Sequence, residues 1–96
     1  MLYGMIDTVA TDHCPFQSYE KDWGKDDFTK IPNGCPGVEN LYPYMLDAAN
    51  SGKITFERAV ELCSTNVAKI FGCDNKGSIS VGKDADIVIY DKDKDF

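Results

Sequence analysis

The sequence predicts an α/β fold in which one strand and a long loop precede three helices and two short strands. Residues 5–11 ("MIDTVAT") alternate loosely and carry β-branched side chains, which is typical of a short buried strand. Apolar side chains then recur at helical spacing through residues 38–71. Residues 76–91 ("KGSISVGKDADIVIYD") contain two short strand-like runs around "VGKDA", and the run "IVIY" is the stronger. With 96 residues, the chain has the length of one small domain.

A long loop follows the first predicted strand, because Pro15 prevents that strand from continuing. From Pro15 to Pro36 the chain shows no periodicity, and it includes the turn-rich segment "IPNGCPG" at residues 31–37. Loops of this length in compact domains are usually functional or disordered. The aromatic side chains and rigid turns of this loop favour a functional role.

The first predicted helix lies in "GVENLYPYMLDAANSG", where the apolar positions follow i, i+3, i+4 spacing. Gly52 is expected to end this helix. Pro43 is compatible with a helix only in its first turn, so the start is expected at Asn40 rather than at Val38.

Two further helices are predicted from their end signals. Thr55 can cap the helix "FERAVELC", in which Glu57 favours the positive end of the helix dipole. Ser64 or Thr65 can cap a third short helix, "STNVAKIFG", which Gly72 is expected to terminate.

Composition excludes several classes of partner. The net charge is -6 and the sequence has no cluster of Lys or Arg, which argues against binding of nucleic acid or anionic membranes. The four cysteines form no C-x-x-C pair, so we expect free thiols in a reducing compartment. The sequence has neither a signal peptide pattern nor an apolar stretch long enough for a membrane span. A cytoplasmic protein, or a piece of one, is expected.

The stretch "VATDHCPF" places Asp12, His13 and Cys14 directly after the first predicted strand. At the carboxyl end of a barrel strand, Asp12 can bind a divalent metal and act as a general base in hydrolysis. Alternatively, Asp12 caps the turn through the backbone near Cys14. His13 points the opposite way in a strand, so it is expected either to support a neighbouring ligand residue or to pack, and Cys14 is expected to behave as a small hydrophobe. These three residues alone do not make a metal site, because catalytic zinc takes ligands from separated positions.

Four motifs, in order, resemble the C-terminal third of the dihydropyrimidinase/D-hydantoinase family, cyclic-amide hydrolases of the amidohydrolase superfamily. The motifs are "DTVATDHCPF", "FTKIPNGCPGVENLYPYML", "ELCSTNVAKIFG" and "KGSISVGKDADIVIYD". The resemblance implies a (β/α)8 barrel with two metal ions, usually zinc. Asp12 corresponds to the family's aspartate after the eighth strand, which binds a metal and shuttles a proton from hydroxide to the leaving nitrogen. Asn33 corresponds to the loop residue whose backbone groups hold the substrate ring.

One position distinguishes relatives within this superfamily, and another part of the chain departs from the family pattern. Dihydroorotases carry a histidine for the substrate carboxylate where this chain has Phe16, which cannot pair with an anion. A neutral dihydropyrimidine or hydantoin is therefore the expected substrate, and an allantoinase is a less suitable match to "IPNGCPG". Asn40-Leu41 replaces an acidic residue and arginine found in many members, which puts loop anchoring or subunit contacts in doubt.

The family's remaining metal ligands have no counterpart in a chain with one histidine. We therefore expect a C-terminal fragment: residues 1–73 from the barrel and residues 74–96 from the accessory β-sandwich. The isolated chain is expected to be inactive and to bind no metal stoichiometrically. Its first strand has no local partner, which predicts dimerisation or partial disorder of the fragment. The resemblance implies a homo-oligomeric parent, a tetramer or dimer.

Two other classes of protein fit part of the pattern. Some relatives of dihydropyrimidinase have lost metal ligands and act as scaffold proteins, although such a scaffold has no chemical need for Asp12. The second alternative is a small acidic binding domain whose turn imitates the motif. A His-x-His pair upstream would distinguish the enzyme from the scaffold.

Overall fold

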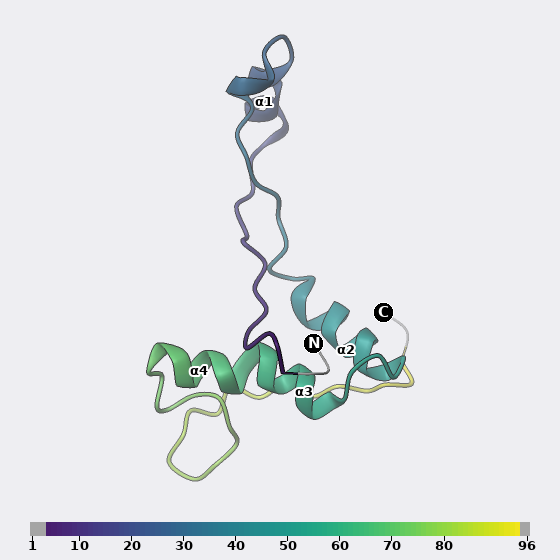
Figure 1. Cartoon of the computed structure of the whole chain (residues 1–96), viewed down its shortest axis with the longest axis vertical. Coiled ribbons are helices and arrows are strands. Elements are labelled where there is room, and N and C mark those ends of the chain that lie inside the picture. The colour runs from purple at the N-terminus through teal and green to yellow at the C-terminus, as the bar shows by residue number, and fades with distance from the viewer. Residues whose placement is uncertain (1–3, 95–96) are drawn as a thin grey trace. The chain divides into compact units, whose positions relative to one another are not determined.

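The computed structural model describes residues 4–94. Along the chain the helices are α1 (Ser18–Lys21), η1 (Asp22–Gly24), η2 (Phe28–Lys30), α2 (Leu41–Asn50), α3 (Phe56–Val60), η3 (Glu61–Thr65) and α4 (Asn66–Phe71) (Figure 1). The chain forms two compact units: Ala10–Pro43 is one unit, and the described residues on both sides of it form the other. These units differ from the predicted barrel and sandwich segments, 1–73 and 74–96, whose boundary stays a prediction.

Helices α3, η3 and α4 form one continuous helical rod, because η3 is a π-helix that joins α3 to α4 without a break (Figure 1). The rod begins as predicted: the Thr55 hydroxyl accepts the N–H of Arg58 at 3.1 Å. It also ends as predicted, at Gly72, which has φ 67° and donates its N–H to Ala68. The predicted cap at Ser64 or Thr65 is wrong. Thr65 has helical backbone angles and caps nothing, since the helix does not stop there.

Helix α2 begins at Leu41, one residue after the predicted start, with Pro43 in its first turn. After its end at Asn50, Gly52 takes a φ of 74° and donates its N–H to Ala49, as predicted for the closing glycine. The buried core of this unit is small and comes from α2, the rod and the segment between them. Its members are Met45, Ala49, Ile54, Ala59, Leu62 and Ala68.

The predicted strand at residues 5–11 does not form. Instead, its backbone polar groups bond to the helical rod. The Arg58 guanidinium donates to the Ile6 carbonyl at 2.6 Å, and the Asn66 amide donates to the Asp7 carbonyl at 2.8 Å. The Val9 N–H donates to the carbonyl of Leu62 at 3.1 Å. Residues 4–94 offer no neighbouring strand to pair with these backbone groups, so the rod supplies their partners.

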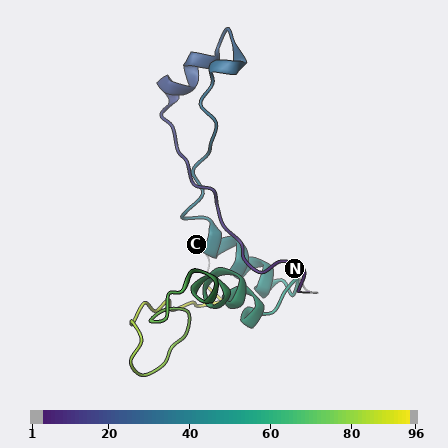
Figure 2. The ribbon, with the colours of Figure 1, turned by 60° about the vertical axis from the view of Figure 1, so that its left-hand side comes forward.

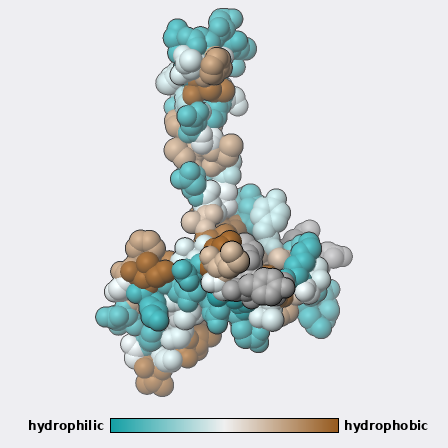
Figure 3. Space-filling model, viewed as in Figure 1, coloured by the Kyte–Doolittle hydropathy of each residue, from teal (hydrophilic) through white to brown (hydrophobic). Residues whose placement is uncertain are grey.

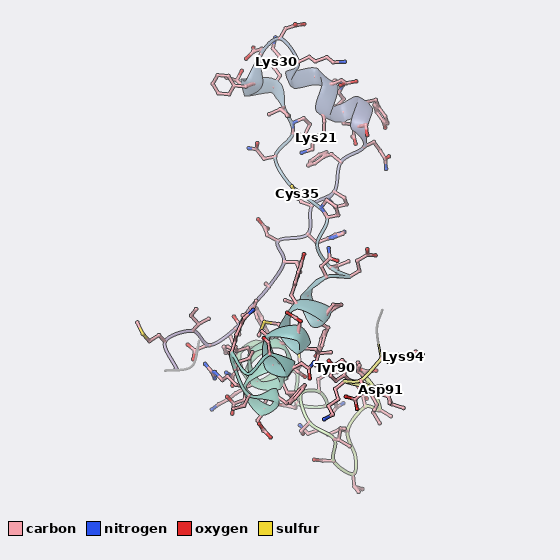
Figure 4. The ribbon with its side chains drawn as sticks, turned by 90° about the vertical axis from the view of Figure 1, so that its right-hand side faces the viewer. Lys21, Lys30, Cys35, Tyr90, Asp91 and Lys94 are labelled. Atoms are coloured by element: carbon pink, nitrogen blue, oxygen red, sulfur yellow. The ribbon has the colours of Figure 1, made fainter. Side chains whose placement is uncertain are left out.

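The two strands predicted around "VGKDA" are also absent from the described part of the chain, so the start of a β-sandwich stays a prediction. Lys76 holds this segment together through ion pairs with Asp86 and with Asp84, the latter at 2.9 Å. Hydrogen bonds to Asp86 and Asp84 raise the pKa of Lys76 above its usual range. Tyr90 packs against Phe56, with ring centroids 6.0 Å apart and ring planes tilted by 45°. The charged tail is described as far as Lys94, and its last two residues lie outside the described range (Figure 4).

Many large apolar side chains remain exposed, and brown hydrophobic patches appear on the surface in Figure 3. The most exposed include Met5, Ile79, Val81 and Ile89. All four cysteines are free, as predicted, and burial raises the pKa of the Cys63 thiol. Within residues 4–94, every helix is too short or too polar to cross a membrane.

Candidate active site around Asp12 and Asn33

The segments that carry Asp12 and Asn33 run side by side within the unit Ala10–Pro43 (Figures 1 and 2). His13 and Cys35 form an isolated parallel bridge, and the Cys14 N–H donates to the Cys35 carbonyl at 3.1 Å. Gly34 allows this approach, because a Cβ atom at that position would lie 2.4 Å from the Cys14 carbonyl oxygen. The structure therefore brings together the two segments that the sequence singled out separately.

Asp12 sits on a left-handed turn. Its φ of 49° is the only positive value for a non-glycine residue among the described residues. Aspartate tolerates this conformation better than most residues, and such strained positions concentrate at functional sites. The hydroxyl of Thr11 accepts the His13 N–H at 3.2 Å and so closes the turn around Asp12.

The carboxylate of Asp12 is exposed. No hydrogen bond or ion pair links it to any other residue in the range 4–94, so it does not make the alternative backbone cap near Cys14. The turn is stabilised by Thr11 instead. The Asp12 carboxylate is consequently available to bind a cation or to exchange a proton with a ligand.

His13 has a structural role, although its side chain is exposed rather than packed. Its Nδ1 atom accepts the backbone N–H of Gly37 at 3.0 Å and that of Val38 at 3.1 Å. These two bonds tie the end of the loop to the residue next to Asp12.

Lys21 contacts the loop on both sides of Asn33. From the end of α1, its ammonium donates to the Pro32 carbonyl at 2.5 Å and to the Gly34 carbonyl at 2.8 Å (Figure 4). The same ammonium lies 5.0 Å from the centre of the Phe16 ring. No pattern in the sequence points to Lys21, because its partners are eleven and thirteen residues away and no regular structure relates them.

Metal-binding side chains do not gather at this turn. Across residues 4–94, no group of three or more His, Cys, Asp or Glu side chains is placed to hold a metal ion. The single carboxylate of Asp12 is too few donors for a stable divalent metal site. The described residues therefore do not fit a complete metal centre.

The pattern of the amidohydrolase family matches residues 1–96, so the chain is a member of that family. Dihydropyrimidinase from Rattus norvegicus is 49% identical over 90 residues, which are 92% of this chain and 17% of that protein. Dihydroorotase from Halobacterium salinarum is 43% identical over 90 residues, 94% of this chain and 21% of that protein.

Among solved structures, D-hydantoinase from Thermus sp. matches with a TM-score of 0.79 at 45% identity. The match covers 85% of this chain and 18% of that one. The resemblance to dihydropyrimidinases and D-hydantoinases that the four motifs predict is thus confirmed. The chain spans about a fifth of the length of the curated relatives that it matches.

Proposed function

We propose that the whole protein to which these residues belong is a cyclic-amide hydrolase. It opens dihydropyrimidine or hydantoin rings to N-carbamoyl amino acids. The observation that carries this proposal is the free carboxylate of Asp12, on a strained turn beside the Asn33 loop, in a chain 49% identical to a dihydropyrimidinase.

Ring opening requires a group that moves one proton. Water adds to a ring carbonyl carbon, the bond from that carbon to the ring nitrogen breaks, and the nitrogen leaves with a proton taken from the water. A carboxylate in hydrogen-bond reach can take the proton and then deliver it. We assign this role to Asp12 and assign the binding of the ring amide to the backbone groups of Asn33. Asn33 is exposed, as a substrate contact requires.

We further propose that Asp12 is one ligand of a divalent metal in the whole protein, with two zinc ions as the expected form. Amidohydrolases generally use divalent metals. The remaining ligands have to come from residues outside this chain, because the described residues provide no group of three or more His, Cys, Asp or Glu side chains placed to hold a metal ion. The isolated chain is therefore expected to be inactive and to bind no metal stoichiometrically.

The wider assignment follows the same proposal. Residues 1–73 are assigned to the C-terminal part of a (β/α)8 barrel and residues 74–96 to an accessory β-sandwich. We propose a cytoplasmic homo-oligomer, a tetramer or dimer, that acts on small neutral cyclic amides and binds neither nucleic acid nor membranes. Light scattering of the whole protein tests the oligomeric state.

A hybrid enzyme tests the function directly. This chain replaces the matching segment of the Thermus sp. D-hydantoinase, and hydrolysis of hydantoin and dihydrouracil is measured. Asp12→Asn is expected to lower kcat by about a hundredfold or more, the usual contribution of a positioned acid–base group. Asp26→Asn is the matched control, because Asp26 is an exposed carboxylate of the same unit, and it should stay within about twofold of the parent hybrid.

A dihydroorotase is the second candidate, since one relative carries that name. Phe16 argues against this candidate, because an apolar ring cannot pair with a substrate carboxylate, and the Lys21 ammonium beside it already donates to the carbonyls of Pro32 and Gly34. Faster turnover of dihydroorotate than of dihydrouracil by the hybrid would favour this candidate. A folded hybrid that binds metal but hydrolyses none of these rings would contradict the enzyme assignment and favour a scaffold protein.

A further inference from the structure

We propose that Lys21 is a positioning residue that aims the Asn33 peptide group at the substrate. The proposal rests on the function proposed above and adds a residue outside the four motifs. Lys21 contacts neither Asp12 nor any reacting atom. It acts through the loop, by bonding to the carbonyls of Pro32 and Gly34 on the two sides of Asn33.

The geometry of the peptide bond explains how this bond aims Asn33. The carbonyl of Pro32 and the N–H of Asn33 belong to one planar trans peptide group, so they point in opposite directions. Because the Pro32 carbonyl points at the Lys21 ammonium, the Asn33 N–H has to point away from it. The hydrogen bonds of residues 4–94 do not use this N–H, which leaves it free to bond to a substrate carbonyl.

The surroundings of Lys21 suit this role. An ammonium carries three N–H donors, so it can bond to two carbonyls at once, which a neutral side chain of this length does less well. The Phe16 ring lies 5.0 Å from the ammonium and attracts it through its π face. Phe16 thus supports the lysine. His13 holds the far end of the same loop through Gly37 and Val38.

Kinetics separate this positioning role from a general role in stability. In the hybrid enzyme, Lys21→Met is expected to raise KM for dihydrouracil about tenfold and to leave kcat within about twofold, because the proton-transferring Asp12 is untouched. Lys21→Arg retains N–H donors and should restore KM to within about threefold. Lys25→Met is the control: Lys25 lies in the same unit and is exposed, with an ion pair to Asp22 at 3.3 Å.

A second measurement needs no activity. Acetic anhydride in limiting amount labels lysine amines, and mass spectrometry gives the rate at each site. The amine of Lys21 is partly buried and donates two hydrogen bonds. It should therefore react at least about fivefold more slowly than the amines of Lys25 and Lys30, which have 74% and 69% of their side chains exposed.

The outcomes separate the two proposals. Equal labelling of Lys21 and Lys25, or an unchanged KM in Lys21→Met, overturns the role of Lys21 and leaves the hydrolase assignment intact. A fall in kcat at constant KM also overturns it. If Lys21 is protected while the parent hybrid hydrolyses no cyclic amide, the proposed function fails, and with it the role toward substrate, although the contact to the loop stands.

Discussion

Gly34 is the position where a single methyl group should do most damage to the candidate site. Its φ is 131°, a conformation that side-chain-bearing residues rarely adopt. A Cβ atom there would lie 2.4 Å from the Cys14 carbonyl oxygen and 2.8 Å from the Cys14 Cβ. Gly34→Ala therefore imposes backbone strain and also forces the Asp12 and Asn33 segments apart.

The free energy of this perturbation can be worked from two contributions. An alanine in a sparsely populated backbone region costs about 1–3 kcal/mol. Separation of the two segments also weakens the hydrogen bond from Cys14 N–H to the Cys35 carbonyl, worth about 1 kcal/mol. We expect a total of about 2–4 kcal/mol for Gly34→Ala. Gly37→Ala should cost less than about 1 kcal/mol, because its Cβ would lie 3.3 Å from the side chain of Thr11 and its φ is not left-handed.

Native-state hydrogen exchange of the Cys14 amide measures this cost in the 96-residue chain. A loss of about 2–4 kcal/mol corresponds to exchange about 30- to 700-fold faster, since about 1.4 kcal/mol is a factor of ten. Gly37→Ala should accelerate exchange by no more than about fivefold. If the two variants exchange at the same rate, the close approach of Gly34 to Cys14 is not what holds the segments together, and the reasoning is refuted.

Two further predictions concern the other unit. Thr55→Val removes the hydroxyl that accepts the Arg58 N–H and should lower the free energy of unfolding by about 1 kcal/mol, whereas Thr55→Ser keeps the cap. Urea titration followed by circular dichroism distinguishes the two variants, and equal midpoints would contradict the cap. Burial raises the pKa of Cys63, so iodoacetamide at pH 8 should label it more slowly in the folded chain than in urea. Because the folded pKa lies above the unfolded one, the contribution of this thiol to stability should fall as the pH rises through about 8.5 and above. Equal labelling rates would show that Cys63 is not shielded.

The helix ends were predictable because their signals are local. Thr55 bonds to a backbone group three residues away, and Gly52 and Gly72 supply the positive φ values that follow α2 and α4. None of these depends on distant parts of the chain, so the residue type and its neighbours are enough. The predicted strand at residues 5–11 depends instead on distant residues, since a strand exists only with a partner strand.

The candidate site was predictable in part for the same reason. The pattern around Asp12 and the turn at Asn33 are visible in the sequence. The family match over the whole chain shows that the chain belongs to the amidohydrolase family. Their side-by-side arrangement depends on the His13–Cys35 bridge and on Lys21, which join residues far apart in sequence. No periodicity relates such residues, so only the structure shows them.

The π-helix η3 changes the helical phase of α4, which follows it. In an uninterrupted α-helix, Ala59 and Ala68 would face about 180° apart, but one additional residue in the wide turn brings them to about 80°. Both side chains are buried. The positions of the buried side chains therefore follow one helical phase before η3 and a shifted phase after it. Deletion of a single residue between Glu61 and Thr65 would turn α4 by about 100° and carry Ala68 to the solvent side. The length of this turn is thus as tightly specified as the identity of the side chains around it.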